Sequence, residues 1–170
     1  MFTRENELPR PRWSRLTQLP APLAELESRL SAVLEKHGML ILRVSLGVVF
    51  LWFGALKFFP GLSSAEGLAS RTIEVLTFGV VGPRWSMPIL ATWECAIGVG
   101  LVVGRPIRLT LALLFLQMLG TFAPLLLFPG ETFVSFPFVA TLEGQYIIKN
   151  VVLISAGLVL WGSNRKGAES

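Results

Sequence analysis

Four apolar stretches, each long enough to cross a lipid bilayer, constrain most strongly how this chain can fold. They cover Gly38–Phe59, Ser86–Val103, Ile107–Phe128 and Gln145–Gly162. A hydrocarbon core about 30 Å thick is spanned by about 20 helical residues, with about 17 as the lower limit. Backbone N–H and C=O groups find no water there, so each span should be an α-helix. The sequence therefore predicts an all-α integral membrane four-helix bundle.

Composition supports a membrane protein and argues against other classes. Hydrophobic residues make up 52% of the 170 residues, which is too high for an ordinary soluble domain with four such stretches. The net charge of +4 does not indicate nucleic-acid binding, because the basic residues flank the spans and do not gather on one face. The lipid bilayer is thus the predicted partner, and no nucleic acid is expected.

The basic residues outside the spans predict the orientation of the bundle. They gather before the first span, between the second and third, and after the fourth, as at Arg29, Lys36, Arg105, Arg108, Arg165 and Lys166. The two longer loops hold only Arg71 and Arg84. Because positive loops stay on the cytoplasmic side, both termini are predicted to be cytoplasmic. We expect a tail with an interfacial helix over residues 1–37, the bundle over 38–163, and a tail over 164–170.

Three segments outside the spans also carry predictions. Leu23–His37 has leucines on one helical face and charges on the other, which predicts a short amphipathic helix that ends before Gly38. Ser63 and Glu66 have the spacing of a capping box and predict an outer surface helix. The loop Pro129–Gly144 is apolar and aromatic, so we expect it to fold over the bundle or into the membrane interface.

Each span carries small or polar residues on a single helical face. Residues three, four, seven or eleven apart share a face, because each residue turns the helix by about 100°. Small residues at such positions let helices approach closely. The four faces are expected to meet at a shared axis, and they carry Arg43, Gly47, Phe50, Gly54 and Lys57 in the first span, Glu94, Gly98 and Arg105 in and after the second, Gln117 in the third, and Lys149 with Asn150 beside it in the fourth.

Glu94 is the most informative of these residues, because a charge at the centre of a membrane helix costs about 2.5–3.5 kcal/mol. Lys57 and Lys149 lie toward the outer ends of their spans, so both are predicted to reach Glu94, whereas Arg43 lies near the inner end. Two interpretations stay open. The ion pair either locks helix packing, or the cluster lines an outward-facing cavity, where two lysines against one glutamate favour an anion or a carbonyl oxygen. Gln117 is expected to form an interhelical hydrogen bond.

Three segments resemble the DoxX-like family of small bacterial membrane proteins. The first is RVSLGVVFLWFGALKFFP at residues 43–60, and the second is WECAIGVGLVVGR at residues 93–105. The third, YIIKNVVL at residues 146–153, is most similar to the YkgB branch, which is associated with reactive-chlorine resistance. Together with the intervening chain, the resemblance covers residues 40–161.

The resemblance implies a four-helix bundle in the bacterial cytoplasmic membrane. It also implies a link to membrane oxidoreductase complexes, thiosulfate–quinone chemistry and oxidative-stress defence. The motif positions that it assigns, without a role for any of them, are Arg43, Gly54, Lys57, Glu94, Gly98, Arg105 and Lys149.

The sequence argues against an enzyme that acts on its own. The chain has one cysteine and one histidine, and it lacks a dinucleotide-binding glycine motif, so we expect no metal site and no evident cofactor, with a quinone as the candidate ligand. The first hypothesis is an accessory protein of redox or oxidant-stress defence, with an oxidoreductase partner or as a homo-oligomer. The others are a small proton-linked transporter and a non-catalytic scaffold or assembly factor.

Overall fold

The computed structural model describes residues 20–63 and 65–166. Predictions for residues 1–19 and 167–170 therefore concern segments outside the described residues. Within the described ranges the chain forms six helices and a two-stranded sheet. It divides into two compact units, and the boundary between them falls between Gly38 and Met39.

Helix α1 (Ala21–Leu56) continues through Gly38. The predicted end of the N-terminal helix before this residue is therefore wrong. A single glycine within a helix costs only about 1 kcal/mol relative to alanine, and no proline follows until Pro60. The amphipathic pattern of residues 23–37 is confirmed as helix: its leucines are about half exposed, and Arg29 pairs with Glu25 at 2.6 Å on the polar face.

Four helices are long and apolar enough to cross a membrane. They are α1, α3 (Pro83–Val103), α4 (Ile107–Leu127) and α6 (Leu142–Lys166). The predicted four-helix membrane bundle is confirmed, and the third span agrees with α4 to within one residue. The helices of the second and fourth spans are longer than predicted, because both begin three residues earlier, in less apolar segments, and α6 also continues to Lys166.

The core of the bundle is a single apolar cluster along its interior. All four long helices contribute to it, through Leu46 and Phe50 of α1, Ile97 and Leu101 of α3, Leu111, Leu114 and Met118 of α4, and Leu160 of α6. Large apolar side chains also cover the outside, as at Trp52 and Leu119, where they remain more than two-thirds exposed. An apolar exterior is what a bundle surrounded by lipid requires.

Two glycines bring the backbones of α1 and α3 into contact. A Cβ atom built on Gly98 would lie 2.7 Å from the backbone nitrogen of Leu51 and 2.8 Å from the carbonyl oxygen of Gly47. One built on Gly47 would lie 2.9 Å from the carbonyl oxygen of Gly98. No side chain fits at such distances, so the small residues in the two sequence patterns fix how these helices pack.

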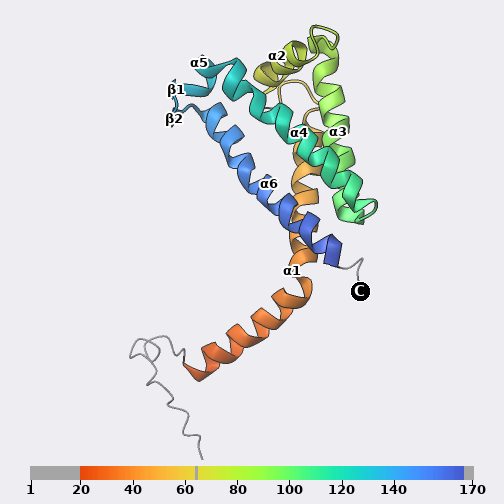
Figure 1. Cartoon of the computed structure of the whole chain (residues 1–170), viewed down its shortest axis with the longest axis vertical. Helices are drawn as coiled ribbons and strands as arrows, with labels where there is room; N and C mark the ends of the chain where they lie inside the picture. Colours follow the sequence, from red (N-terminus) through yellow and green to blue (C-terminus); the bar gives the residue numbers. More distant parts are fainter. Residues whose placement is uncertain (1–19, 64, 167–170) are drawn as a thin grey trace, which may run out of the picture. The chain divides into compact units, whose positions relative to one another are not determined.

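The two longer loops, which we call the outer loops after their predicted orientation, form one layer, the outer layer, at one end of the bundle. Helix α2 (Glu66–Leu76) packs on α3 and α4, and α5 (Pro129–Thr132) leads into the hairpin of β1 (Phe133–Ser135) and β2 (Val139–Ala140). Figure 1 shows these elements together, at the end opposite the C-terminal end of α6. The predicted surface helix is therefore confirmed, and the second loop also has secondary structure of its own.

Two features of this layer were not predicted correctly from the sequence: the start of α2, and an ion pair between α2 and α5. The predicted capping box of Ser63 and Glu66 is wrong, because the N-cap residue of α2 is Ala65, which makes no side-chain cap hydrogen bond. Glu66 accepts instead from the backbone N–H of Gly61 at 2.8 Å. Arg71 of α2 pairs with Glu131 of α5 through both terminal nitrogens of its guanidinium group, one of them at 2.8 Å, and this pair joins the two outer loops. These hydrogen bonds and the charge of Glu131 raise the pKa of Arg71 above its ordinary value.

Candidate functional site

Glu94 lies near the middle of α3, buried at the point where α3 faces the last turn of α1. A Cβ atom built on Gly54 would lie only 2.8 Å from Cβ of Glu94, so the glycine of α1 leaves room for the acidic side chain. Helix α1 ends two residues later at Leu56. At the level of Glu94, the first helix thus gives way to the turn that begins with Lys57.

Lys57 forms an ion pair with Glu94. Its Nζ atom donates to Oε2 of Glu94 at 2.6 Å, and the two side chains are only 15% and 11% exposed. The same ammonium group donates to the carbonyl oxygen of Phe53 at 3.3 Å, within the last turn of α1. A cation near the C-terminal end of a helix is favoured by the helix dipole and by free carbonyl groups. The end of α1 therefore holds Lys57 in position for the carboxylate.

Gln117 of α4 completes the contacts of the carboxylate. Its Nε2 atom donates to Oε1 of Glu94 at 2.7 Å, so each carboxylate oxygen accepts one hydrogen bond. The predicted interhelical hydrogen bond is confirmed, and Glu94 is its acceptor. We call Lys57, Glu94 and Gln117 the Glu94 network. It joins α3 and α4 to the end of α1.

One atom of the Glu94 network has no hydrogen-bond partner. Oε1 of Gln117 is buried and unpartnered, the one such side-chain atom among the residues that the structure describes. Buried polar groups are hydrogen-bonded in the large majority of cases, and an exception calls for a physical explanation such as a bound water, ion or ligand. The network therefore offers a hydrogen-bond acceptor to a further group.

The structure does not bring Lys149 to Glu94, contrary to the sequence prediction. Lys149 is exposed, and its Nζ atom lies 5.3 Å from the centre of the Tyr146 ring on the same helix. The outer half of α6 turns a different face to the protein, with Gly144 against the carbonyl oxygen of Thr132 and Ile147 buried. The contact with α5 thus directs Lys149 away from the axis of the bundle.

Asn150, Arg43 and Arg105, which the sequence placed in the same cluster or pattern, also lie elsewhere. Asn150 donates to the carbonyl oxygen of Tyr146 at 3.1 Å, within its own helix. Arg43 and Arg105 line a pocket at the other end of the bundle, together with Gly104 and Asn164. The predicted polar positions therefore separate into three groups: the Glu94 network, the arginine pocket, and Lys149 with Asn150, which belong to neither.

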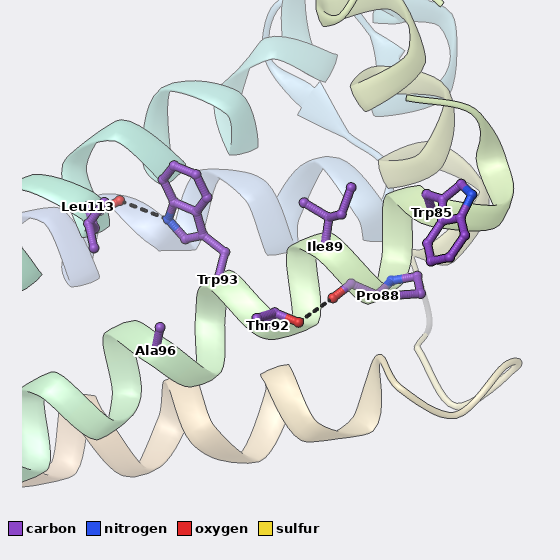
Figure 2. A pocket seen from close by; sticks show the side chains of 7 residues that line it. All are labelled: Trp85, Pro88, Ile89, Thr92, Trp93, Ala96 and Leu113. Carbon is purple, nitrogen blue, oxygen red and sulfur yellow. Dashed lines mark hydrogen bonds between the residues drawn. The ribbon is translucent and has the colours of Figure 1, made fainter. Parts of the chain in front are cut away.

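A second pocket, with a volume of about 450 Å³, lies on the outside of α3 and α4. Figure 2 shows its lining, which is apolar apart from Thr92. The hydroxyl group of Thr92 donates to the carbonyl oxygen of Pro88 at 2.8 Å, and the indole N–H of Trp93 donates to that of Leu113 at 3.2 Å. No residue of the Glu94 network lines this pocket or the arginine pocket. An apolar groove of this kind suits a lipid chain and offers no group for chemistry.

The charges of the Glu94 network differ from those expected. With Lys149 elsewhere, one ammonium group faces one carboxylate, so the positive excess that favoured an anion is absent. No group of three or more His, Cys, Asp or Glu side chains that could hold a metal ion occurs in residues 20–63 and 65–166. What the site offers a ligand is a balanced ion pair and a free carbonyl oxygen.

Comparison with protein families agrees with the membrane fold. A family model described as DoxX matches residues 38–128, more than half of the chain. The chain belongs to the DoxX family. No curated protein and no solved structure matches it. The DoxX match includes the whole Glu94 network and excludes α6, so the residues that meet at Glu94 belong to the family region and Lys149 does not.

The contact between Gln117 and Glu94 could have been found in the sequence. Glu94 lies ten residues before Gly104, and Gln117 lies ten residues after Ile107, on either side of a short turn. Two antiparallel helices joined by a short turn bring residues at equal distances from the turn to the same level. This symmetry predicts that the carboxyl and amide groups meet. The unpartnered Oε1 atom has no comparable signal in the sequence.

Proposed function

We propose that this DoxX-family protein is an accessory component of redox or reactive-chlorine stress defence in the bacterial cytoplasmic membrane, as in the YkgB branch that its fourth span resembles. In this proposal the Glu94 network binds a small polar ligand, and a membrane oxidoreductase carries out the electron transfer. The division of roles follows from the composition, since a chain with one cysteine and one histidine supplies neither a dithiol nor a paired-histidine haem site.

The observation that supports ligand binding is the free acceptor at Oε1 of Gln117. Lys57 donates to Glu94 and to Phe53, and Gln117 donates to Glu94, whereas Oε1 of Gln117 accepts no hydrogen bond, so a ligand that donates a hydrogen bond of its own would satisfy this acceptor. A quinol has hydroxyl groups that donate, whereas the corresponding quinone has only carbonyl oxygens that accept. The network is therefore suited to the reduced form of a quinone, in place of the anion or carbonyl oxygen that the sequence favoured.

Binding of a short-chain ubiquinol and of the matching ubiquinone to the protein in detergent micelles tests this proposal. Because a hydrogen bond contributes about 0.5–1.5 kcal/mol, the quinol should bind about two- to tenfold more tightly than the quinone. Tryptophan fluorescence, with Trp93 on the same helix as Glu94, provides the measurement. Gln117→Leu should abolish the preference for the quinol.

The matched control is Gln145→Leu, which replaces an exposed glutamine of α6 and should leave the preference unchanged. Equal or tighter binding of the quinone by the unmodified protein would refute the assignment of the ligand. In cells, the double variant Lys57→Met/Glu94→Gln, which leaves no unpaired charge, should lower survival in hypochlorous acid while the amount of protein in the membrane stays constant. If this variant is lost from the membrane instead, Glu94 serves packing and the functional proposal fails.

A further inference from the structure

The arginine pocket lies at the end of the bundle opposite the outer layer. Its walls are formed by three segments: residues 39–43 in the middle of α1, the turn between α3 and α4, and the end of α6. Its volume is about 420 Å³. Arg43 lies eleven residues from Gly54 on α1, or about 16 Å along the helix, so this pocket is separate from the Glu94 network.

The pocket carries two positive charges and no negative charge. Arg43 and Arg105 are both lining residues, and no acidic residue is among the ten that line it. Within the described part of the chain, the side chains of Arg43 and Arg105 make no hydrogen bond and no ion pair. Each guanidinium group has five N–H donors in a planar fork, which fits phosphate oxygens in pairs.

The turn between α3 and α4 holds Arg43 in place. Gly104 has a φ of 80° and closes the end of α3, and a Cβ atom built on it would lie 1.6 Å from Nη1 of Arg43. Only glycine meets both conditions, because other residues rarely adopt this φ and their Cβ atom would displace the guanidinium group. Arg43 is therefore packed against the backbone of the turn that also carries Arg105.

The remaining lining residues are apolar on α1, α3 and α4, and include two polar residues at the end of α6. Leu40, Val103 and Ile107 contribute apolar surface, and Val103 is 63% exposed toward the outside of the bundle. At the end of α6, Ser163 and Asn164 both donate to the carbonyl oxygen of Leu160, at 3.0 and 3.1 Å. The hydroxyl donor of Ser163 is thus occupied, and the side-chain oxygen atoms of both residues can accept from a hydroxylated group.

We propose that the arginine pocket binds an anionic phospholipid, with the phosphate between Arg43 and Arg105 and the acyl chains along Leu40 and Val103. A soluble phosphate would use the arginines alone, whereas a lipid also covers the apolar wall that continues onto the lipid-facing surface. Basic pockets between membrane helices bind anionic headgroups for the same reason. The glycerol headgroup of phosphatidylglycerol adds hydroxyl donors for the free oxygens of Ser163 and Asn164. This inference does not depend on the proposed function.

Native mass spectrometry of the purified protein with phosphatidylglycerol, and separately with phosphatidylcholine, tests this site. The unmodified protein should bind phosphatidylglycerol more tightly. Because a hydrogen bond to a charged group has a large effect, Arg43→Gln and Arg105→Gln should each weaken that binding about tenfold and leave phosphatidylcholine binding unchanged. The affinity of Arg43→Lys for phosphatidylglycerol should lie between those of the unmodified protein and Arg43→Gln, since lysine keeps the charge but lacks the planar set of N–H donors.

The matched control is Arg84→Gln, which removes an exposed arginine at the N-terminal end of α3, near the outer layer. It should leave phosphatidylglycerol binding unchanged, and an equal loss there would show non-specific charge attraction and overturn the proposal. Inorganic phosphate is the second arm. If it displaces phosphatidylglycerol at equal concentration, the pocket holds a soluble anion and the lipid assignment is wrong.

Discussion

Lys57→Met is expected to destabilise the bundle by about 3–5 kcal/mol, because it leaves the buried carboxylate of Glu94 without its cation. Gln117 alone then faces the acidic group, which must either stay charged in an apolar setting or take up a proton. The free energy of unfolding in mixed detergent micelles measures the loss. The double variant Lys57→Met/Glu94→Gln should recover most of it, since no unpaired charge remains.

Lys149→Met is the matched control, because the sequence suggests the same role for this lysine as for Lys57. The structure places it in solvent-exposed contact with Tyr146, so its loss should change the free energy of unfolding by no more than about 1 kcal/mol. A large loss in Lys149→Met together with a small one in Lys57→Met would show that the wrong lysine is assigned to Glu94.

Gly98→Ala is expected to cost about 1–3 kcal/mol in the free energy of unfolding, as for an overpacked core. The added methyl group would lie 2.6 Å from Cγ of Leu51 and 2.7 Å from the backbone nitrogen of the same residue. Backbone atoms cannot move aside as the end of a flexible side chain can, so α1 and α3 must separate. Because Glu94 lies one helical turn from Gly98, the separation should also weaken the contact with Lys57.

Gly162→Ala provides the comparison for this substitution. A Cβ atom at Gly162 would meet nothing within 4 Å, so the variant should be at least as stable as the unmodified protein, and up to about 1 kcal/mol more stable, because alanine favours a helix more than glycine does. The same unfolding measurement on both variants separates the effect of packing from that of removing a glycine. Equal stability of the two variants would contradict the close approach of α1 and α3 at Gly98.

The spans and the close helix contacts could be predicted from the sequence because both follow from local pattern. Hydropathy alone placed α4 to within one residue, and the glycines of the first two spans marked the faces that meet. The continuation of α1 through Gly38 could not be predicted in this way. A helix can end at a glycine or continue through it, because the two outcomes differ only modestly in free energy, and the residues around the glycine decide between them.

The site was predictable only in part, because the sequence pattern assumes that each helix keeps one face inward along its whole length. That assumption holds for Glu94 and Gln117 near the middle of α3 and α4. It fails for α6, whose outer half turns Gly144 toward α5 and the hairpin and buries Ile147. The position of Lys149 depends on how the second outer loop folds, which the periodicity of α6 does not contain.

A solid-state NMR measurement on the protein in lipid bilayers tests the central pairing most directly. Lysine is labelled with ¹⁵N at Nζ and glutamate with ¹³C at the carboxyl carbon, and transfer of magnetisation between them reports contact. Lys57 with Glu94 is the one lysine–glutamate ion pair in the described residues. The signal should therefore vanish in Lys57→Met and persist in Lys149→Met. A signal that persists in Lys57→Met and vanishes in Lys149→Met would contradict the Glu94 network.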